Sequence, residues 1–432
     1  MNINKLHPTE QLAITMARTY NMKLTSSKGG NLSLKDDEGN IWITPGGTDK
    51  RALTKEDIIK VTPDGKVYGI HPVSSEFPLH KTIYESCPDI RSIMHAHPPA
   101  LVMYSLLREI PEVKIIPDLA NACVKPGVAK YATPGTAYLG EALAEEINCD
   151  KLTLVMENHG ICVVGDTVFG IYSSFESLEQ AALINRAANV LGESVVLSDA
   201  QINDYNNSYL FERYDEFVHE VISDEEKSAR ALLCDVSKRA YEKKIMFSSL
   251  GATSQRTGDN SFVITPEDGD PDMYGPEDMV CVSEGMCEKG KTPSHWAKLH
   301  EKIYKKHPEI KSIMTALPAN LMAYAVTHTP LNTMLMTEAY VFLRDIPNIP
   351  YEDTLKKSDE LAEMICKSCP MVIQENLCAT VIGKDAFDAF VSMEAAEDYA
   401  YGMLEASALG EVKMISDKDI EDLKKLFSKY GG

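Results

Sequence analysis

Three histidines and one glutamate in the first half of the chain are suited to binding a catalytic metal ion. His95 and His97 end an apolar run that predicts a strand, and their spacing of two places both side chains on one face. His159 follows a second apolar run, and Glu76 precedes a predicted helix. Imidazole and carboxylate groups are common zinc ligands, and a set without structural cysteines that keeps one displaceable ligand is typical of catalytic zinc. We therefore predict a four-residue metal site.

Two glycine turns and a pair of serines in the same half are suited to binding a phosphate. Glycine lets backbone N–H groups approach an anion closely, and serine adds a hydroxyl donor. The residues concerned are Gly30, Asn31, Gly46, Gly47, Ser74 and Ser75. A metal site and a phosphate site within one domain predict a phosphorylated small-molecule substrate.

The second half of the chain repeats the first. The helix that begins near Pro78 and the strand that ends at His95 recur at an offset of 220 residues, and four blocks keep their order while the offset drifts only from 222 to 218. Such ordered self-similarity indicates a tandem duplication. The boundary falls in a polar stretch near Asp224, which predicts domains at residues 1–224 and 225–432.

The second copy has lost the chemistry of the first. Glu76, His95, His97 and His159 correspond to Trp296, Thr315, Leu317 and Leu377. One glycine turn becomes Ala252–Thr253, and the other becomes Glu267–Asp268, whose carboxylates would repel a phosphate. We therefore expect one metal ion per chain and a second domain without a metal site.

Helical and strand patterns alternate within each copy. Apolar spacing predicts helices over Thr9–Lys23 and Thr167–Leu191 and a strand over Arg91–His95, while Gly39–Asn40 reads as a hairpin turn. Hairpin-linked strands favour an α/β fold of three α/β/α layers around a largely antiparallel sheet, present twice, over a Rossmann domain.

Composition narrows the partners and the compartment. The 432 residues carry a net charge of -21, which argues against binding to nucleic acid or to anionic membranes. The sequence has no apolar run of the roughly 20 residues that a membrane helix needs, and its first residues lack a secretory signal. We interpret the ten cysteines as buried, reduced thiols. The expected location is cytoplasmic.

The first domain resembles the class II aldolase/adducin family, which includes L-fuculose-1-phosphate aldolases and L-ribulose-5-phosphate 4-epimerases. The resemblance is carried in order by Gly30–Ser33, Ile43–Gly47, Ser74–Glu76, His95–Pro98, Tyr131–Thr136 and His159–Gly160. It implies that the three histidines bind zinc, that Glu76 is the acid/base, and that the glycine and serine residues hold the substrate phosphate. It also implies a homo-oligomer, which for this duplicated chain would be a dimer that forms a pseudo-fourfold ring.

The expected reaction is aldol cleavage or formation of a sugar phosphate through a metal-stabilised enediolate. Fuculose-type aldolases contribute a tyrosine from a neighbouring subunit, and the corresponding segment Ile110–Ile116 contains none. This departure leaves a sugar-phosphate 4-epimerase or dehydratase open as alternatives. An alternative of another class is a non-catalytic, adducin-like scaffold.

Overall fold

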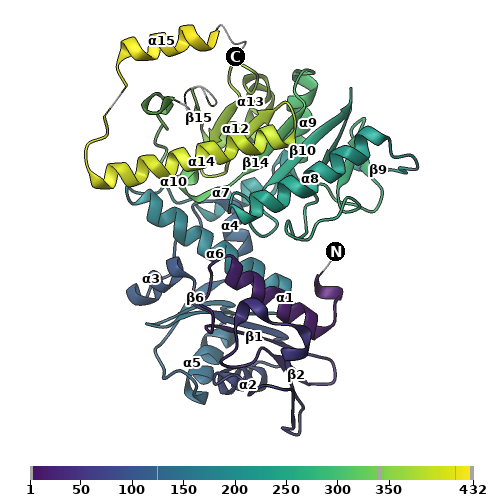
Figure 1. Ribbon diagram of the computed structural model, residues 1–432, viewed down its shortest axis with the longest axis vertical. Helices are drawn as coiled ribbons and strands as arrows, with labels where there is room; N and C mark the ends of the chain where they lie inside the picture. Colours follow the sequence, from purple (N-terminus) through teal and green to yellow (C-terminus); the bar gives the residue numbers. More distant parts are fainter. Residues whose placement is uncertain are drawn as a thin grey trace. The chain divides into compact units, whose positions relative to one another are not determined.

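The computed structural model describes residues 3–123, 125–337, 340, 343, 345–413 and 415–428. The chain forms two compact units (Figure 1). The N-terminal unit contains Asn2–Val113 and Leu119–Ala182, and the C-terminal unit contains Lys114–Asp118 and Leu183–Gly432. The segment that joins the two repeats therefore packs with the second repeat.

The N-terminal unit is built on an eight-stranded sheet in the order β4-β3-β2-β1-β5-β8-β7-β6. All neighbouring strands are antiparallel except β6 and β7, which are parallel. The strands are β1 (Asn31–Lys35), β2 (Ile41–Ile43), β3 (Ile59–Val61), β4 (Val67–Tyr68), β5 (Ser92–Ala96), β6 (Pro126–Ala129), β7 (Thr153–Met156) and β8 (Gly160–Gly165).

Helices cover both faces of this sheet. Figure 1 shows the sheet between α1 and α6 on one side and α2 and α5 on the other. The helices of this part of the chain are α1 (Pro8–Asn21), α2 (Phe77–Ser86), α3 (Pro99–Leu107), α4 (Pro117–Ala122), α5 (Ala137–Asn148) and α6 (Val168–Ala188). Ile93 packs in the core cluster with Leu79 of α2 and Leu143 of α5. Because strand residues alternate between faces, His95 also points toward α2.

The C-terminal unit repeats this architecture. Its nine-stranded sheet has the order β15-β16-β17-β14-β10-β11-β12-β13-β9, which matches the first sheet strand for strand except for the additional edge strand β9. The strands are β9 (Asp215–Phe217), β10 (Ala252–Gly258), β11 (Ser261–Ile264), β12 (Val280–Ser283), β13 (Met286–Glu288), β14 (Ser312–Ala316), β15 (Asn348–Ile349), β16 (Met371–Gln374) and β17 (Cys378–Gly383).

The helices of the second sheet correspond to those of the first. α8 and α14 pack on the central strand β10, while α9 packs on the same strand and against α13. The helices are α7 (Asp199–Asn206), α8 (Asp224–Glu242), α9 (Ala297–Lys306), α10 (Ala319–Val326), α12 (Tyr351–Lys356), α13 (Ser358–Met364), α14 (Ala386–Leu409) and α15 (Asp417–Ser428). The predicted duplicated α/β/α fold with largely antiparallel sheets is confirmed.

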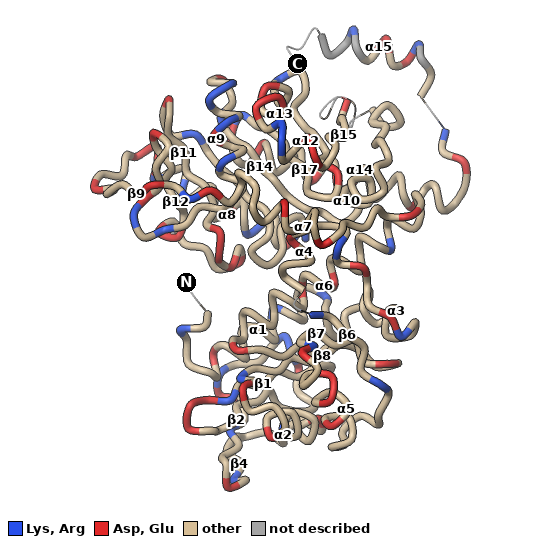
Figure 2. Tube along the Cα trace, turned by 180° about the vertical axis from the view of Figure 1, so that it is seen from behind, with Lys and Arg blue, Asp and Glu red and all other residues tan. Residues whose placement is uncertain are grey.

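The structure also bears on the predictions about charge, membrane helices and cysteines. Figure 2 shows acidic and basic residues interspersed along the loops and helices of each unit. Among the described residues, no helix is long and apolar enough to cross a membrane. Cys149 is exposed, and Cys234, Cys366 and Cys369 are partly exposed. The expectation of buried thiols is therefore wrong for these four residues.

Candidate metal centre

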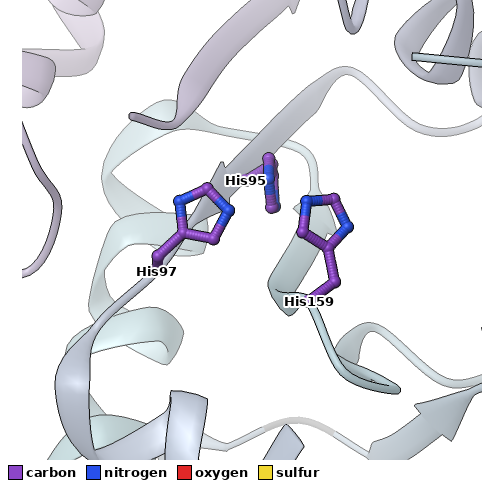
Figure 3. A group of neighbouring side chains, drawn as sticks. All are labelled: His95, His97 and His159. Atoms are coloured by element: carbon purple, nitrogen blue, oxygen red, sulfur yellow. The ribbon is translucent and has the colours of Figure 1, made fainter. Parts of the chain in front are cut away.

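The three predicted histidines meet at one edge of the first sheet. His95 lies near the end of β5, His97 directly follows that strand, and His159 lies in the turn between β7 and β8 (Figure 3). One nitrogen atom from each ring lies within 4.8 Å of the other two. The ring centroids of His95 and His97 are 4.6 Å apart, and those of His95 and His159 are 4.7 Å apart. His95 and His159 are 64 residues apart in the sequence, and the pairing of β5 with β8 brings them together.

Local backbone geometry brings His159 to the pair. His95 lies opposite Cys162 in the antiparallel pairing of β5 and β8, three residues beyond His159. Asn158 has a φ of 54°, a left-handed conformation that asparagine tolerates, and this turns the chain before the histidine. A Cβ on Gly160 would come within 2.7 Å of the Ala96 carbonyl oxygen and 2.8 Å of the His97 ring. Only glycine fits at this close approach.

The environment holds the histidines neutral. Burial and the neighbouring His159 lower the pKa of His95 to about 3, although a hydrogen bond to Ile161 opposes this shift. Burial and the other two rings lower the pKa of His97 to about 4, and burial also lowers the pKa of His159. At neutral pH each ring thus has an unprotonated nitrogen with a lone pair, which metal binding requires.

The Glu76 carboxylate lies beside His95 and His159 and could serve as a fourth ligand. Nδ1 of His95 donates to the Ile161 carbonyl oxygen at 2.9 Å, which leaves Nε2 as the lone-pair nitrogen. Among the described residues this buried Nε2 has no hydrogen-bond partner, and it lies 3.3 Å from Oε2 of Glu76. Oε1 of Glu76 lies 3.6 Å from Nε2 of His159. A divalent cation between these atoms would satisfy all of them, so the residues present fit zinc.

A buried chain of hydrogen bonds positions Glu76, and the sequence did not reveal it. Nδ2 of Asn31 donates to Oε2 of Glu76 at 2.5 Å, and Nε2 of His80 donates to Oδ1 of Asn31. Nδ1 of His80 then accepts from Ser33 Oγ at 2.7 Å. Burial lowers the pKa of His80 to about 3, so its ring is neutral and can both donate and accept. The recurrence of His80 as His300 was the only available signal.

The predicted phosphate-binding turns lie next to each other and to the histidines. A Cβ on Gly46 would lie 3.3 Å from Ser74 Cα, and a Cβ on Gly29 would lie 3.3 Å from His97 Nδ1. Gly30 and Gly47 have φ values of 72° and 70°, which favour glycine. Ser74 is buried, whereas Ser75 is exposed. The Gly46 N–H donates to the Pro72 carbonyl oxygen, so this backbone amide is not free to bind an anion as the glycine turn had suggested.

A buried lysine beside these turns was missed by sequence reasoning. Nζ of Lys50 donates to the Pro45 carbonyl oxygen at 2.7 Å, and the residue is 1% exposed. Burial lowers its pKa to about 8, while the Glu76 carboxylate opposes the shift. The lysine thus adds a positive charge near Gly46 and Glu76. A single lysine in a turn has no distinguishing pattern, because its burial depends on the surrounding fold.

In the second repeat, Glu267 stands at the position of Gly46, and its carboxylate lies where the first repeat has a predicted phosphate-binding turn. Oε2 of Glu267 accepts from the His295 backbone N–H at the start of α9, and Oε1 lies 3.0 Å from His295 Nδ1. Trp296, at the position of Glu76, is fully buried. Nε2 of His295 lies 3.0 Å from Tyr205 Oη and 3.6 Å from Asp118 Oδ2. These contacts stabilise the second repeat at the position that corresponds to the candidate site of the first.

We expect the free energy of unfolding of the C-terminal unit to decrease as the pH rises from about 6.5 to about 10. Burial lowers the pKa of His295, but Asp118 and Glu267 outweigh it and raise the pKa to about 10. A raised folded-state pKa stabilises below the unfolded value of about 6.5, and this contribution is lost as pH rises through 10. Urea unfolding at pH 7 and pH 9 measures it. His295→Gln should reduce the difference in free energy of unfolding between the two pH values, whereas His328→Gln should retain it. An unchanged difference in His295→Gln would contradict the role assigned to His295.

A second group of potential ligands lies outside this site. His219, Glu226 and Cys281 have ligand atoms within 4.8 Å of one another. However, the Glu226 carboxylate already binds His219 at 2.8 Å and the Arg230 guanidinium at 2.7 Å. Burial and Glu226 raise the pKa of the Cys281 thiol to about 12, which keeps it neutral. The guanidinium and the protonated thiol both disfavour a cation, so this group is better explained as an ion pair.

Comparison with known proteins identifies relatives of one repeat. An L-fuculose phosphate aldolase of Methanococcus vannielii is 32% identical over 166 residues, which are 38% of this chain and 88% of that protein. A 5-deoxy-D-ribulose 1-phosphate aldolase of Bacillus thuringiensis serovar kurstaki is 29% identical over 194 residues, 44% of this chain and 89% of that protein. A 3-oxo-tetronate 4-phosphate decarboxylase of Haemophilus influenzae is 26% identical over 204 residues, 46% of this chain and 96% of that protein.

The family assignment applies to both repeats. A solved L-fuculose 1-phosphate aldolase is 30% identical, with a TM-score of 0.42 and coverage of 45% of this chain and 92% of that one. The family model described as Class II Aldolase and Adducin N-terminal domain matches residues 10–185 and again residues 231–404. Since these matches cover most of the chain, the protein belongs to the class II aldolase and adducin N-terminal domain family and carries that domain twice.

Proposed function

We propose that the first repeat is a zinc-dependent aldolase that cleaves or forms a carbon–carbon bond in a sugar phosphate. The observation that carries the proposal is the convergence of three neutral histidines, two of which lie beside the carboxylate of Glu76. Zinc bound there would act as a Lewis acid that stabilises the negative charge developing on the substrate as the bond breaks. The aldolase names of several relatives support the same class of reaction.

The proposed roles of the chain's own residues follow from their positions. Glu76 would bind the metal and accept the proton of the hydroxyl group that becomes the aldehyde carbonyl. The Asn31–His80 chain would hold the carboxylate in place. Gly30, Asn31, Gly47, Ser74 and Ser75 would hold the substrate phosphate. Gly46 would let its turn pass close to Ser74, and Lys50 would add positive charge nearby.

The aldolase proposal is tested with phosphorylated substrates of the relatives. We expect a ketose 1-phosphate such as L-fuculose 1-phosphate to yield one aldehyde and one dihydroxyacetone phosphate per molecule cleaved, measured by a coupled assay and by NMR. The reaction should stop when the metal is chelated and resume when zinc is added. Release of CO2 from a 3-oxo-tetronate 4-phosphate, or epimerisation without cleavage, would replace the aldolase proposal by another reaction. Failure of every sugar phosphate would favour the scaffold alternative.

We further propose that the repeats correspond to residues 1–224 and 225–432 and that two chains form a pseudo-fourfold ring. The matching strand order of the two sheets supports this, because a tandem duplication can replace one symmetry step of a ring. Light scattering should then give twice the chain mass of 47.8 kDa. A fully active monomer would contradict the ring, and the retained second repeat would need another explanation.

A further inference from the structure

Two cysteines of the second repeat face each other across a tight hairpin. Cys366 and Cys369 lie between α13 and β16 and are paired as an antiparallel bridge. The Cys366 N–H donates to the Cys369 carbonyl oxygen at 3.2 Å, and the Cys369 N–H donates to the Cys366 carbonyl oxygen at 2.9 Å. Residues that exchange both hydrogen bonds have Cα atoms about 5.5 Å apart. This spacing lies within the range of about 4.4–6.8 Å found for disulfides.

The two thiols differ in a way that suits sequential reaction. Both residues are partly exposed, and Lys367 and Ser368 between them are exposed. The Ser368 hydroxyl lies 3.1 Å from Cys366 Sγ, and this contact lowers the pKa of Cys366 although burial opposes it. Burial raises the pKa of Cys369 to about 11. Cys366 is therefore the more readily ionised, attacking thiol, and Cys369 is the thiol that reacts second.

We infer that Cys366 and Cys369 form a redox-active dithiol that small-molecule disulfides oxidise to an intramolecular disulfide. The Cys366 thiolate attacks one sulfur of a disulfide RSSR, which forms a mixed disulfide and releases one thiolate RS−. Cys369 loses its proton and attacks Sγ of Cys366, which forms the Cys366–Cys369 bond and releases the second RS−. The protein loses two electrons and two protons, and RSSR becomes two RSH.

A metal site is the main alternative for two neighbouring thiols, and the surroundings do not support it. A structural zinc site requires four protein ligands. Across the described residues, the groups of three or more potential metal ligands contain neither Cys366 nor Cys369. Cys369 and Ser368 instead line a cavity of about 340 Å³, which leaves open space beside Cys369.

The first repeat supplies a matched internal control. At the offset of 218 residues that relates β7 to β16, the hairpin corresponds to Asn148–Lys151. That turn contains a single cysteine, Cys149, which is exposed and corresponds to Lys367. Cys149 can form a mixed disulfide but has no second cysteine at a corresponding position in its turn. Any preference of Cys366 over Cys149 therefore reports the paired arrangement rather than exposure.

The experiment treats the full-length protein with glutathione buffers of increasing oxidised fraction, quenches free thiols by alkylation, and maps the peptides by mass spectrometry. We expect the Cys366–Cys369 disulfide to form in buffers roughly tenfold more reducing than those that modify Cys149. In Cys369→Ser the mixed disulfide should accumulate on Cys366, and in Cys366→Ser rapid modification of Cys369 should be lost. Cys149→Ser should leave the disulfide unchanged.

The proposal is overturned if Cys366 and Cys369 of the wild-type protein stay reduced, and are therefore alkylated in the quench, in buffers that modify Cys149. It is also overturned if each carries its own glutathione while both variants unfold at the wild-type temperature. Neither result depends on the aldolase activity, since the dithiol lies in the second repeat, where the four proposed metal ligands are replaced. The wild-type measurement stands even where a serine variant folds poorly.

Discussion

Glu76→Gln is expected to lower the turnover number for the sugar phosphate substrate about 10²- to 10⁴-fold, the usual contribution of a general acid or base. Glutamine keeps the size of the side chain and can still contact Asn31, which lies 2.5 Å from the carboxylate. It lacks the basicity needed to accept a substrate proton. Steady-state kinetics with the best substrate measures the effect, and zinc content is determined on the same sample.

The zinc content separates the two roles proposed for Glu76. Loss of turnover with zinc retained indicates proton transfer, whereas loss of both indicates that the carboxylate is needed as a ligand. Glu85→Gln, an exposed position on α2, the helix that begins directly after Glu76, should keep wild-type turnover. Near-wild-type activity in Glu76→Gln would show that another group transfers the proton, and the role assigned to Glu76 would be wrong.

His159→Ala and His95→Ala are each expected to weaken zinc binding by more than about 100-fold. Loss of an outer-shell partner alone costs about 10- to 100-fold, and these residues are proposed as direct ligands. The wild-type chain should hold one equivalent of metal after dialysis, measured by elemental analysis. His95 is fully buried, so His159, which is partly exposed, gives the variant better able to keep its fold.

The duplicated chain provides the control for this measurement. Thr315 occupies the position of His95 in β14 and bonds to His300 and Thr380 at 3.0 Å and 2.9 Å. Thr315→Ala alters the same strand position without touching a proposed ligand, so the zinc content should stay at one equivalent. Two equivalents in the wild type would implicate the group around His219 as a second site. Unchanged zinc in His159→Ala would refute the ligand set.

Much of the architecture was predictable from local sequence patterns. Helical spacing over Thr9–Lys23 and Thr167–Leu191 matches α1 (Pro8–Asn21) and α6 (Val168–Ala188), and the strand predicted over Arg91–His95 is β5. Side-chain periodicity is a property of neighbouring residues, so it can be read without a fold. The duplication was predictable for a similar reason, because self-similarity compares the chain only with itself.

The contacts that make the site were decided by the tertiary structure. Asn31 lies 45 residues from Glu76 in the sequence. It can donate a hydrogen bond to the Glu76 carboxylate only because β1 pairs with β5 and α2 packs over both strands. Lys50 is buried although its sequence reads as an exposed turn.

The sequence by itself determined that the chain is duplicated, that each copy alternates helices and strands, and which histidines share a face. The grouping of His159 with His95 and His97 was predicted from residue types, but only the tertiary structure shows that their ring nitrogens lie close together. Only the tertiary structure decided that Glu267 pairs with His295 and that the Gly46 amide is engaged. The physical reason is that hydrogen bonding and burial depend on which distant segments the sheet brings together, and no local pattern encodes those pairings.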